Sequence, residues 1–243
     1  MDKITLIIIL LLLWVSFLIT NKFNTIDPVI IDSGKPGPVV LMVGGTHGNE
    51  PAGTVGLEKL IKSNLYIKRG KIIIVPKVNK IGLSLGIRLG FNGFLPIDYN
   101  RNYPLEHNQI KPNKPYYNIN EQIQMMVDNA DFVIDFHEGW NFHKVEPTSL
   151  GSGLYSSKTP LSKSISLDIV NELNKTISED KKKFVCEGKH KDIDGTLNYY
   201  CKQINKNYIL VETTGQNNSQ PLDLRVGQVL FIISMLLEKL DMK

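Results

Sequence analysis

The sequence has few of the features that mark specialised protein classes. It contains only two cysteines, Cys186 and Cys201, in 243 residues, which excludes a disulfide-dense miniprotein. The even number leaves open one disulfide bond, but we favour two free thiols. A long basic stripe interleaved with aromatic residues is absent and the net charge is only +4, so nucleic acid is not an expected partner. The composition, 42% hydrophobic and 21% charged, is that of a folded chain with one domain or two small ones.

The longest uncharged stretch is Ile4 to Thr20, which is rich in isoleucine and leucine. As a helix it would extend about 25 Å, close to the thickness of a bilayer core of about 30 Å. A small-residue cleavage site does not follow it. We therefore predict a single-pass membrane anchor over residues 1–22, with secretion after signal cleavage as the alternative. A linker over 23–37 and one folded domain over 38–243 are expected to follow.

The rest of the chain alternates between short apolar runs and longer amphipathic segments. The apolar runs, expected to be buried strands, are 39–43, 71–75, 132–136 and 208–211. The amphipathic segments, expected to be helices, include 51–60, 119–129, 161–177 and 222–240. This alternation predicts an α/β layered fold with a largely parallel or mixed sheet. Residues 80–118 are rich in glycine, asparagine, proline and tyrosine, and a loop of this length is usually functional.

Metal-ligand residue types follow two of the predicted strands. His47 and Glu50 are three residues apart in a glycine-rich turn that leads into a predicted helix. An imidazole and a carboxylate at this spacing can bind one metal ion. His137, after the third apolar run, is a candidate third ligand, and Asp135 is a candidate hydrogen-bond partner for it. The alternative for His137 is a hydrogen-bonded histidine at the edge of a sheet.

Two further motifs carry side chains suited to hydrolysis of a carboxylate-bearing substrate. Asn100 and Arg101 lie in the long loop, and an amide beside a guanidinium suits a substrate carboxylate; an ion pair between Arg101 and Asp98 at the surface is the alternative. Glu212 ends the fourth apolar run. A carboxylate beside a metal site can act as a general base, whereas a solvent-facing Glu212 would have no such role.

The order of these motifs resembles the zinc carboxypeptidase superfamily, and most closely its succinylglutamate desuccinylase/aspartoacylase branch of deacylases. The resemblance spans the chain from about residue 37 to its end. The motifs that carry it are 44–53, 98–104, 135–139, 211–216 and 221–226. It implies a mixed, largely parallel eight-stranded sheet between helices, with one zinc ion at the carboxyl edge of the strands. It also implies hydrolysis of an amide bond next to a carboxylate.

The resemblance implies a role for each motif residue. One Zn²⁺ per chain would be held by His47, Glu50 and His137, and Glu212 would be the general base. Asn100 and Arg101 would bind the substrate carboxylate, and Arg88 would polarise the scissile carbonyl. The expected function is zinc-dependent deacylation of an N-acyl amino acid or short peptide. A metallocarboxypeptidase or cell-wall peptide amidase is the first alternative, and a membrane-tethered binding protein without catalysis is the second.

Overall fold

A computed structural model describes residues 1–23, 25–92, 95–103, 118–186 and 192–243. The elements are α1 (Lys3–Phe23), β1 (Val29–Asp32), β2 (Val39–Gly44), α2 (Pro51–Lys62), β3 (Lys71–Val75), α3 (Lys80–Leu85), β4 (Gly90–Asn92), β5 (Leu95–Ile97), η1 (Tyr99–Arg101), α4 (Ile119–Asn129), β6 (Phe132–Gly139), β7 (Gly153–Ser156), α5 (Pro160–Lys175), η3 (Asp180–Lys182), β8 (Val185–Cys186), α6 (Leu197–Gln203), β9 (Asn207–Thr214), η4 (Gln216–Asn218) and α7 (Leu222–Lys239). Cys186 is half-buried and Cys201 is buried, and they do not form the disulfide bond that their even number left open.

The centre of the fold is a mixed, mostly parallel sheet with the order β1-β3-β2-β6-β9-β7-β8. Strands β3, β2, β6 and β9 are parallel neighbours, while β1 pairs antiparallel with β3 and β7 antiparallel with β9. Strand β2 and the first parts of β6 and β9 are mostly apolar and buried, as expected for strands covered on both faces. The predicted α/β fold with a mixed sheet between helices is confirmed.

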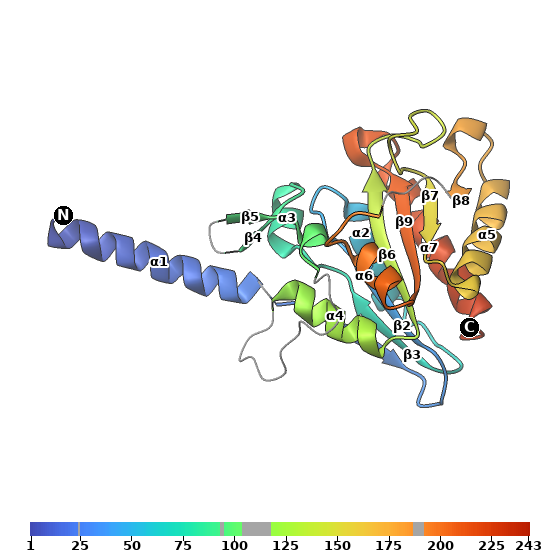
Figure 1. Ribbon diagram of the computed structural model, residues 1–243, viewed down its shortest axis with the longest axis horizontal. Coiled ribbons are helices and arrows are strands. Elements are labelled where there is room, and N and C mark those ends of the chain that lie inside the picture. The colour runs from blue at the N-terminus through green and yellow to red at the C-terminus, as the bar shows by residue number, and fades with distance from the viewer. Residues whose placement is uncertain (24, 93–94, 104–117, 187–191) are drawn as a thin grey trace.

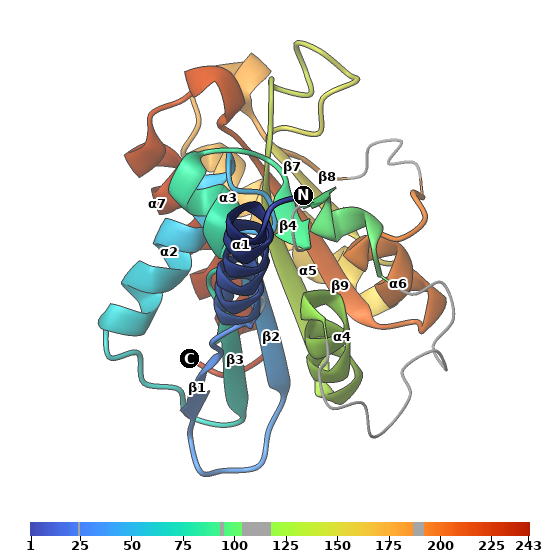
Figure 2. The same cartoon turned by 90° about the vertical axis from the view of Figure 1, so that its left-hand side faces the viewer.

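Helices cover both faces of this sheet (Figures 1 and 2). One face packs against α2, α5 and α7 through a large apolar cluster, and the other packs against α4 and α6 through a second cluster. Alternate residues of β6 face opposite layers, because successive side chains of a strand point to opposite faces. Phe132, Ile134 and Phe136 belong to the first cluster and Val133 to the second. The same alternation places Asp135 and His137 on the face covered by α4 and α6.

The predicted number of eight strands is wrong, because the central sheet of the described residues has seven. Strands β4 and β5 lie within the region predicted to be a long loop, and they pair with each other as a separate two-stranded sheet. The side chain of Leu95 in β5 is 73% exposed. Ile97 of the same strand, by contrast, is partly buried and packs against the second apolar cluster.

Residues 3–23 form the helix α1. Among the residues that the structure describes, no helix combines the length and the apolar character needed to cross a membrane. This finding does not support the transmembrane anchor predicted over residues 1–22. The location of the protein stays a prediction. Within the segment predicted to be a linker, 23–37, residues 29–32 form the edge strand β1.

Replacing Gly53 by alanine is expected to destabilise the fold. Gly53 lies in α2 where the helix crosses β6, and an added Cβ would lie 2.5 Å from the Cβ of Phe136. Such overpacking costs about 1–3 kcal/mol, which urea denaturation can measure. Gly227→Ala is the matched control, because Gly227 lies in α7 with no described atom within 4 Å of its added Cβ. The control should gain about 0.5–1 kcal/mol from helix propensity. A Gly53→Ala protein as stable as the control would contradict this packing.

Candidate active site

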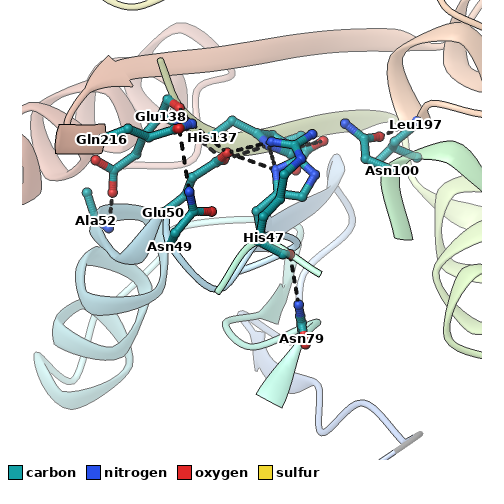
Figure 3. Close-up of polar contacts among 12 residues, drawn as sticks. His47, Asn49, Glu50, Ala52, Asn79, Asn100, His137, Glu138, Leu197 and Gln216 are labelled. Atoms are coloured by element: carbon teal, nitrogen blue, oxygen red, sulfur yellow. Dashed lines mark hydrogen bonds and ion pairs between the residues drawn. The ribbon is translucent and has the colours of Figure 1, made fainter. Parts of the chain in front are cut away.

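Three predicted metal ligands meet at the carboxyl edge of the parallel strands. His47 and Glu50 lie in the loop between β2 and α2, and His137 lies near the end of β6, the neighbour of β2. The Nδ1 atoms of His47 and His137 are 2.9 and 3.0 Å from the two carboxylate oxygens of Glu50 and 3.1 Å from each other. The three side chains are buried, and their ligand atoms lie within 4.8 Å of one another (Figure 3).

A second carboxylate orients each imidazole. The Nε2 atom of His47 lies 3.1 Å from Oδ1 of Asp98, and the Nε2 atom of His137 lies 3.1 Å from Oδ2 of Asp135. A carboxylate on the far nitrogen fixes the ring orientation and the tautomer that leaves Nδ1 free to bind a metal. The Asp135 partner agrees with its predicted role. Asp98 contacts His47 in place of the surface ion pair with Arg101 that was considered from sequence.

The carboxylates around His47 and His137 favour a positive charge within the cluster. Burial by itself lowers the pKa of His137, but the carboxylates of Asp135 and Glu50 outweigh burial and raise this pKa well above its usual range. Burial acts to raise the pKa of Glu50, yet the adjacent His47 and His137 hold it well below its usual range. Two imidazoles and one carboxylate, surrounded by further buried carboxylates, form a donor set that suits a divalent cation such as zinc.

Glu212 lies directly beside this cluster. It is on β9, opposite His137 in the register of the parallel pair β6–β9, and its side chain is buried. Burial raises the pKa of Glu212 to about 8, and the nearby carboxylates of Glu50 and Asp135 add to the effect. Glu212 therefore lines the site. The alternative, in which Glu212 faces solvent, is wrong.

The cluster opens into a cavity of about 180 Å³ that Arg88, Asn100 and Arg101 also line. Arg88 donates to Oε1 of Glu50 at 3.2 Å and to Oδ2 of Asp98 at 3.2 Å, so its guanidinium lies at the edge of the cluster. The Oδ1 atom of Asn100 accepts a hydrogen bond of 3.0 Å from the backbone of Leu197, which leaves its amide NH₂ for other partners. Arg101 is exposed and donates to the carbonyl of Asn100 at 2.6 Å.

The structure adds residues to which the sequence gave no role. Gln216, at the start of η4, donates from Nε2 to Oε1 of Glu50 at 3.0 Å and to the carbonyl of Glu138 at 2.5 Å. The buried carboxylate of Glu138 accepts from the backbone N–H of Ala52 at 2.6 Å and forms an ion pair with Arg225 of α7. In the sequence, these residues stand out only because they lie within or beside the motifs. Their contacts could not be predicted, since their partners are far away along the chain.

Two sequence comparisons identify similar proteins. The family model described as the succinylglutamate desuccinylase/aspartoacylase catalytic domain matches residues 36–236. A curated relative, the N-alpha-acetyl-L-2,4-diaminobutyric acid deacetylase of Halomonas elongata, is 31% identical over 122 residues, which cover 46% of this chain and 32% of the relative. The match thus spans about a third of that protein.

Solved structures share the fold. The product-bound cell shape determinant protein Csd4 of Helicobacter pylori superposes with a TM-score of 0.72 at 19% identity, over 90% of this chain and 56% of that one. A succinylglutamate desuccinylase from Silicibacter sp. gives a TM-score of 0.62 at 17% identity, over 89% of this chain and 61% of that one. The chain therefore spans a little more than half the length of these proteins.

Proposed function

The chain belongs to the succinylglutamate desuccinylase/aspartoacylase catalytic-domain family, and on this premise we propose that it is a zinc-dependent hydrolase. Its reaction is the cleavage of an amide bond next to a carboxylate, as in the deacylation of an N-acyl amino acid. The observation that carries the proposal is the set of buried ligand atoms of His47, Glu50 and His137 within 4.8 Å of one another, with the carboxylate of Glu212 beside them. The deacetylase activity named for the Halomonas relative is of the same chemical class.

His47, Glu50 and His137 fit one zinc ion per chain. Their chemistry is that of a catalytic zinc site with three protein ligands, in which a further position is left to water or substrate. A zinc ion held there would acidify water and polarise the scissile carbonyl. Asp98 and Asp135 hold the two imidazoles from behind, which fixes the donor geometry before the metal binds.

Glu212 is the proposed general base. Its carboxylate accepts a proton from the attacking water and then passes that proton to the nitrogen of the leaving amine. Burial raises the pKa of Glu212, so its ionised carboxylate is a stronger base than that of an exposed glutamate. Because the pair β6–β9 places Glu212 opposite His137, the proton acceptor lies next to the ligands.

Arg88, Asn100 and Arg101 are the proposed substrate contacts. Arg88 lies at the edge of the ligand cluster, where its guanidinium can donate to the oxygen of the scissile carbonyl as negative charge develops on it. Asn100 and Arg101 line the same cavity and bind the substrate carboxylate through an amide and a guanidinium. The substrate is therefore a small compound that bears a carboxylate, an N-acyl amino acid or a short peptide.

An assay with paired substrates tests this function. Wild-type protein supplied with zinc should release the free amino acid from N-acyl amino acids, and Arg101→Ala should raise KM for such a substrate about 10- to 100-fold. A hydrogen bond to a charged group contributes about 1.5–3 kcal/mol, and each 1.4 kcal/mol corresponds to about tenfold in affinity. The variant should change KM little for the same substrate with its carboxylate converted to an amide.

Arg69→Ala is the matched control for this assay, because Arg69 is an exposed arginine whose nearest ion-pair partner is Asp241. Equal effects of Arg101→Ala on the acid and on the amide would remove Arg101 from carboxylate recognition. If the zinc-loaded wild-type protein hydrolysed no N-acyl amino acid and no short peptide, the proposed reaction would be wrong.

A further inference from the structure

A second cavity, of about 400 Å³, lies beside the one that contains the metal ligands. Gln216 lines both cavities. Three segments that are far apart in the sequence form the walls of the second cavity: the loop before α2 with Asn49, the helix α3 with Leu83, and η4 with Asn217 and Asn218. The two cavities therefore adjoin at Gln216.

The lining of the second cavity is neutral and rich in amides. Asn49, Asn217, Asn218 and Gln216 all contribute carboxamide side chains. Among the described lining residues only Arg225 is charged, and its guanidinium is paired with the buried carboxylate of Glu138. Carboxamides both donate and accept hydrogen bonds, which matches the N–H and C=O groups of another amide.

The carboxamide of Gln216 is already bonded to Glu50, Glu138 and Asn49, but two observations indicate that the carbonyl oxygen of Asn49 and the carboxamides of Asn217 and Asn218 are available to a ligand. The Oδ1 atom of Asn49 is buried and accepts no hydrogen bond from any described residue, and such an atom is normally satisfied in the functional state. Asn217 and Asn218 have φ values of 60° and 56°, a left-handed conformation that asparagine adopts more readily than most residues. Both side chains are exposed, so the turn holds two carboxamides at the rim of the cavity.

The relative position of the two cavities indicates which part of the substrate the second cavity would hold. Asn100 lies on one side of the ligand cluster, and Gln216 with Asn49 lies on the other (Figure 3). A substrate whose carboxylate is held at Asn100 and Arg101, and whose scissile bond is at the ligand cluster, must extend its acyl part away from Asn100. That direction leads past Gln216 into the second cavity.

We propose that the second cavity is a subsite for the far part of the acyl group, and that this part carries neutral amide groups, as a peptide does. The assignment rests on the proposed function for the direction of the substrate. It narrows the substrate class to compounds whose acyl side continues beyond an acetyl group through at least one further amide. An acidic acyl chain does not suit this cavity, because its carboxylate would meet no free positive charge among the described lining residues.

Two substrates with the same leaving amino acid test the subsite. N-acetyl-alanine carries a short acyl group, whereas acetyl-glycyl-glycyl-alanine carries two further amides. The double variant Asn217→Gly/Asn218→Gly removes two carboxamides and keeps the left-handed backbone, which glycine adopts freely. We expect it to lower kcat/KM for the long substrate about tenfold, since two hydrogen bonds are lost, and to leave kcat/KM for N-acetyl-alanine within about twofold.

Asn205→Gly is the matched control, because Asn205 has a φ of 52° and lines neither cavity. Titration calorimetry with the long compound in the Glu212→Gln background, in which turnover should be at least about 10²-fold slower, measures binding, and its Kd should rise about tenfold when the double change is added and not when Asn205→Gly is added. If kcat/KM and Kd for the long compound stayed unchanged, the subsite would be wrong. If wild-type protein cleaved neither compound but the Kd still rose, the subsite would stand and the proposed reaction would fall.

Discussion

Replacing Glu212 by glutamine is expected to lower kcat by about 10²- to 10⁴-fold, the usual contribution of a positioned general acid–base group. Glutamine keeps the shape of the side chain but does not accept the proton of the attacking water. KM should change little, because the lost interaction develops in the transition state. Bound zinc should stay near one equivalent per chain, since Glu212 is not among the three residues that converge as ligands. Steady-state kinetics and elemental analysis of the same sample measure both quantities.

The matched control is Glu179→Gln, which changes an exposed glutamate beside η3 and should leave kcat unchanged. Glu212→Gln with wild-type turnover on a confirmed substrate would require another proton acceptor. Loss of zinc together with turnover would instead make Glu212 a ligand. Either result would contradict the division of roles proposed between Glu212 and the three ligands.

Replacing His137 by alanine is expected to abolish the zinc site. Loss of an outer hydrogen-bond partner of a ligand typically weakens metal affinity 10- to 100-fold, so loss of a ligand should weaken it by more than about 100-fold. Activity should fall with zinc occupancy. The fold should also lose stability, by about 3–5 kcal/mol, because the imidazole lies between the buried carboxylates of Glu50 and Asp135 and its removal takes one partner from each of them.

His143→Ala is the control for this variant. His143 is a half-buried histidine whose Nδ1 atom contacts the carbonyl of Ser149 at 2.8 Å, outside the cluster. The His143→Ala protein should retain its zinc and most of its activity. The zinc site would be refuted if metal titration gave the same affinity and stoichiometry for both variants, whatever their relative stabilities in urea.

The sequence predicted the part of the site that depends on strand ends. His47 and His137 follow apolar runs, and these runs became the parallel neighbours β2 and β6. Side chains just beyond such strands meet at one edge of the sheet, so their convergence followed from local pattern. Glu212 was predicted in the same way from the run that became β9. The assignments of catalytic and ligand roles to these residues stay predictions.

Contacts made across long distances in the chain were not predictable. Asp98 lies in the segment interpreted as a loop, yet it contacts His47, 51 residues earlier. Gln216 reaches Glu50 across 166 residues. No spacing rule links such pairs, because their proximity depends on how the layers pack. The strand β7 was missed because its four residues, Gly153–Ser156, have too little apolar alternation to indicate a strand.

The buried ion pair between Glu138 and Arg225 has a consequence for how the protein is made. A domain emerges from the ribosome with its N-terminal part first, so His47 and Glu50 appear early, while Glu212, Gln216 and Arg225 appear late. The backbone N–H of Ala52, at the N-terminus of α2, donates to the carboxylate of Glu138. The ion-pair partner of Glu138 is Arg225 of α7, which is synthesised later. The contact that links Glu138 to α7 therefore cannot form in a nascent chain until this last helix has been synthesised.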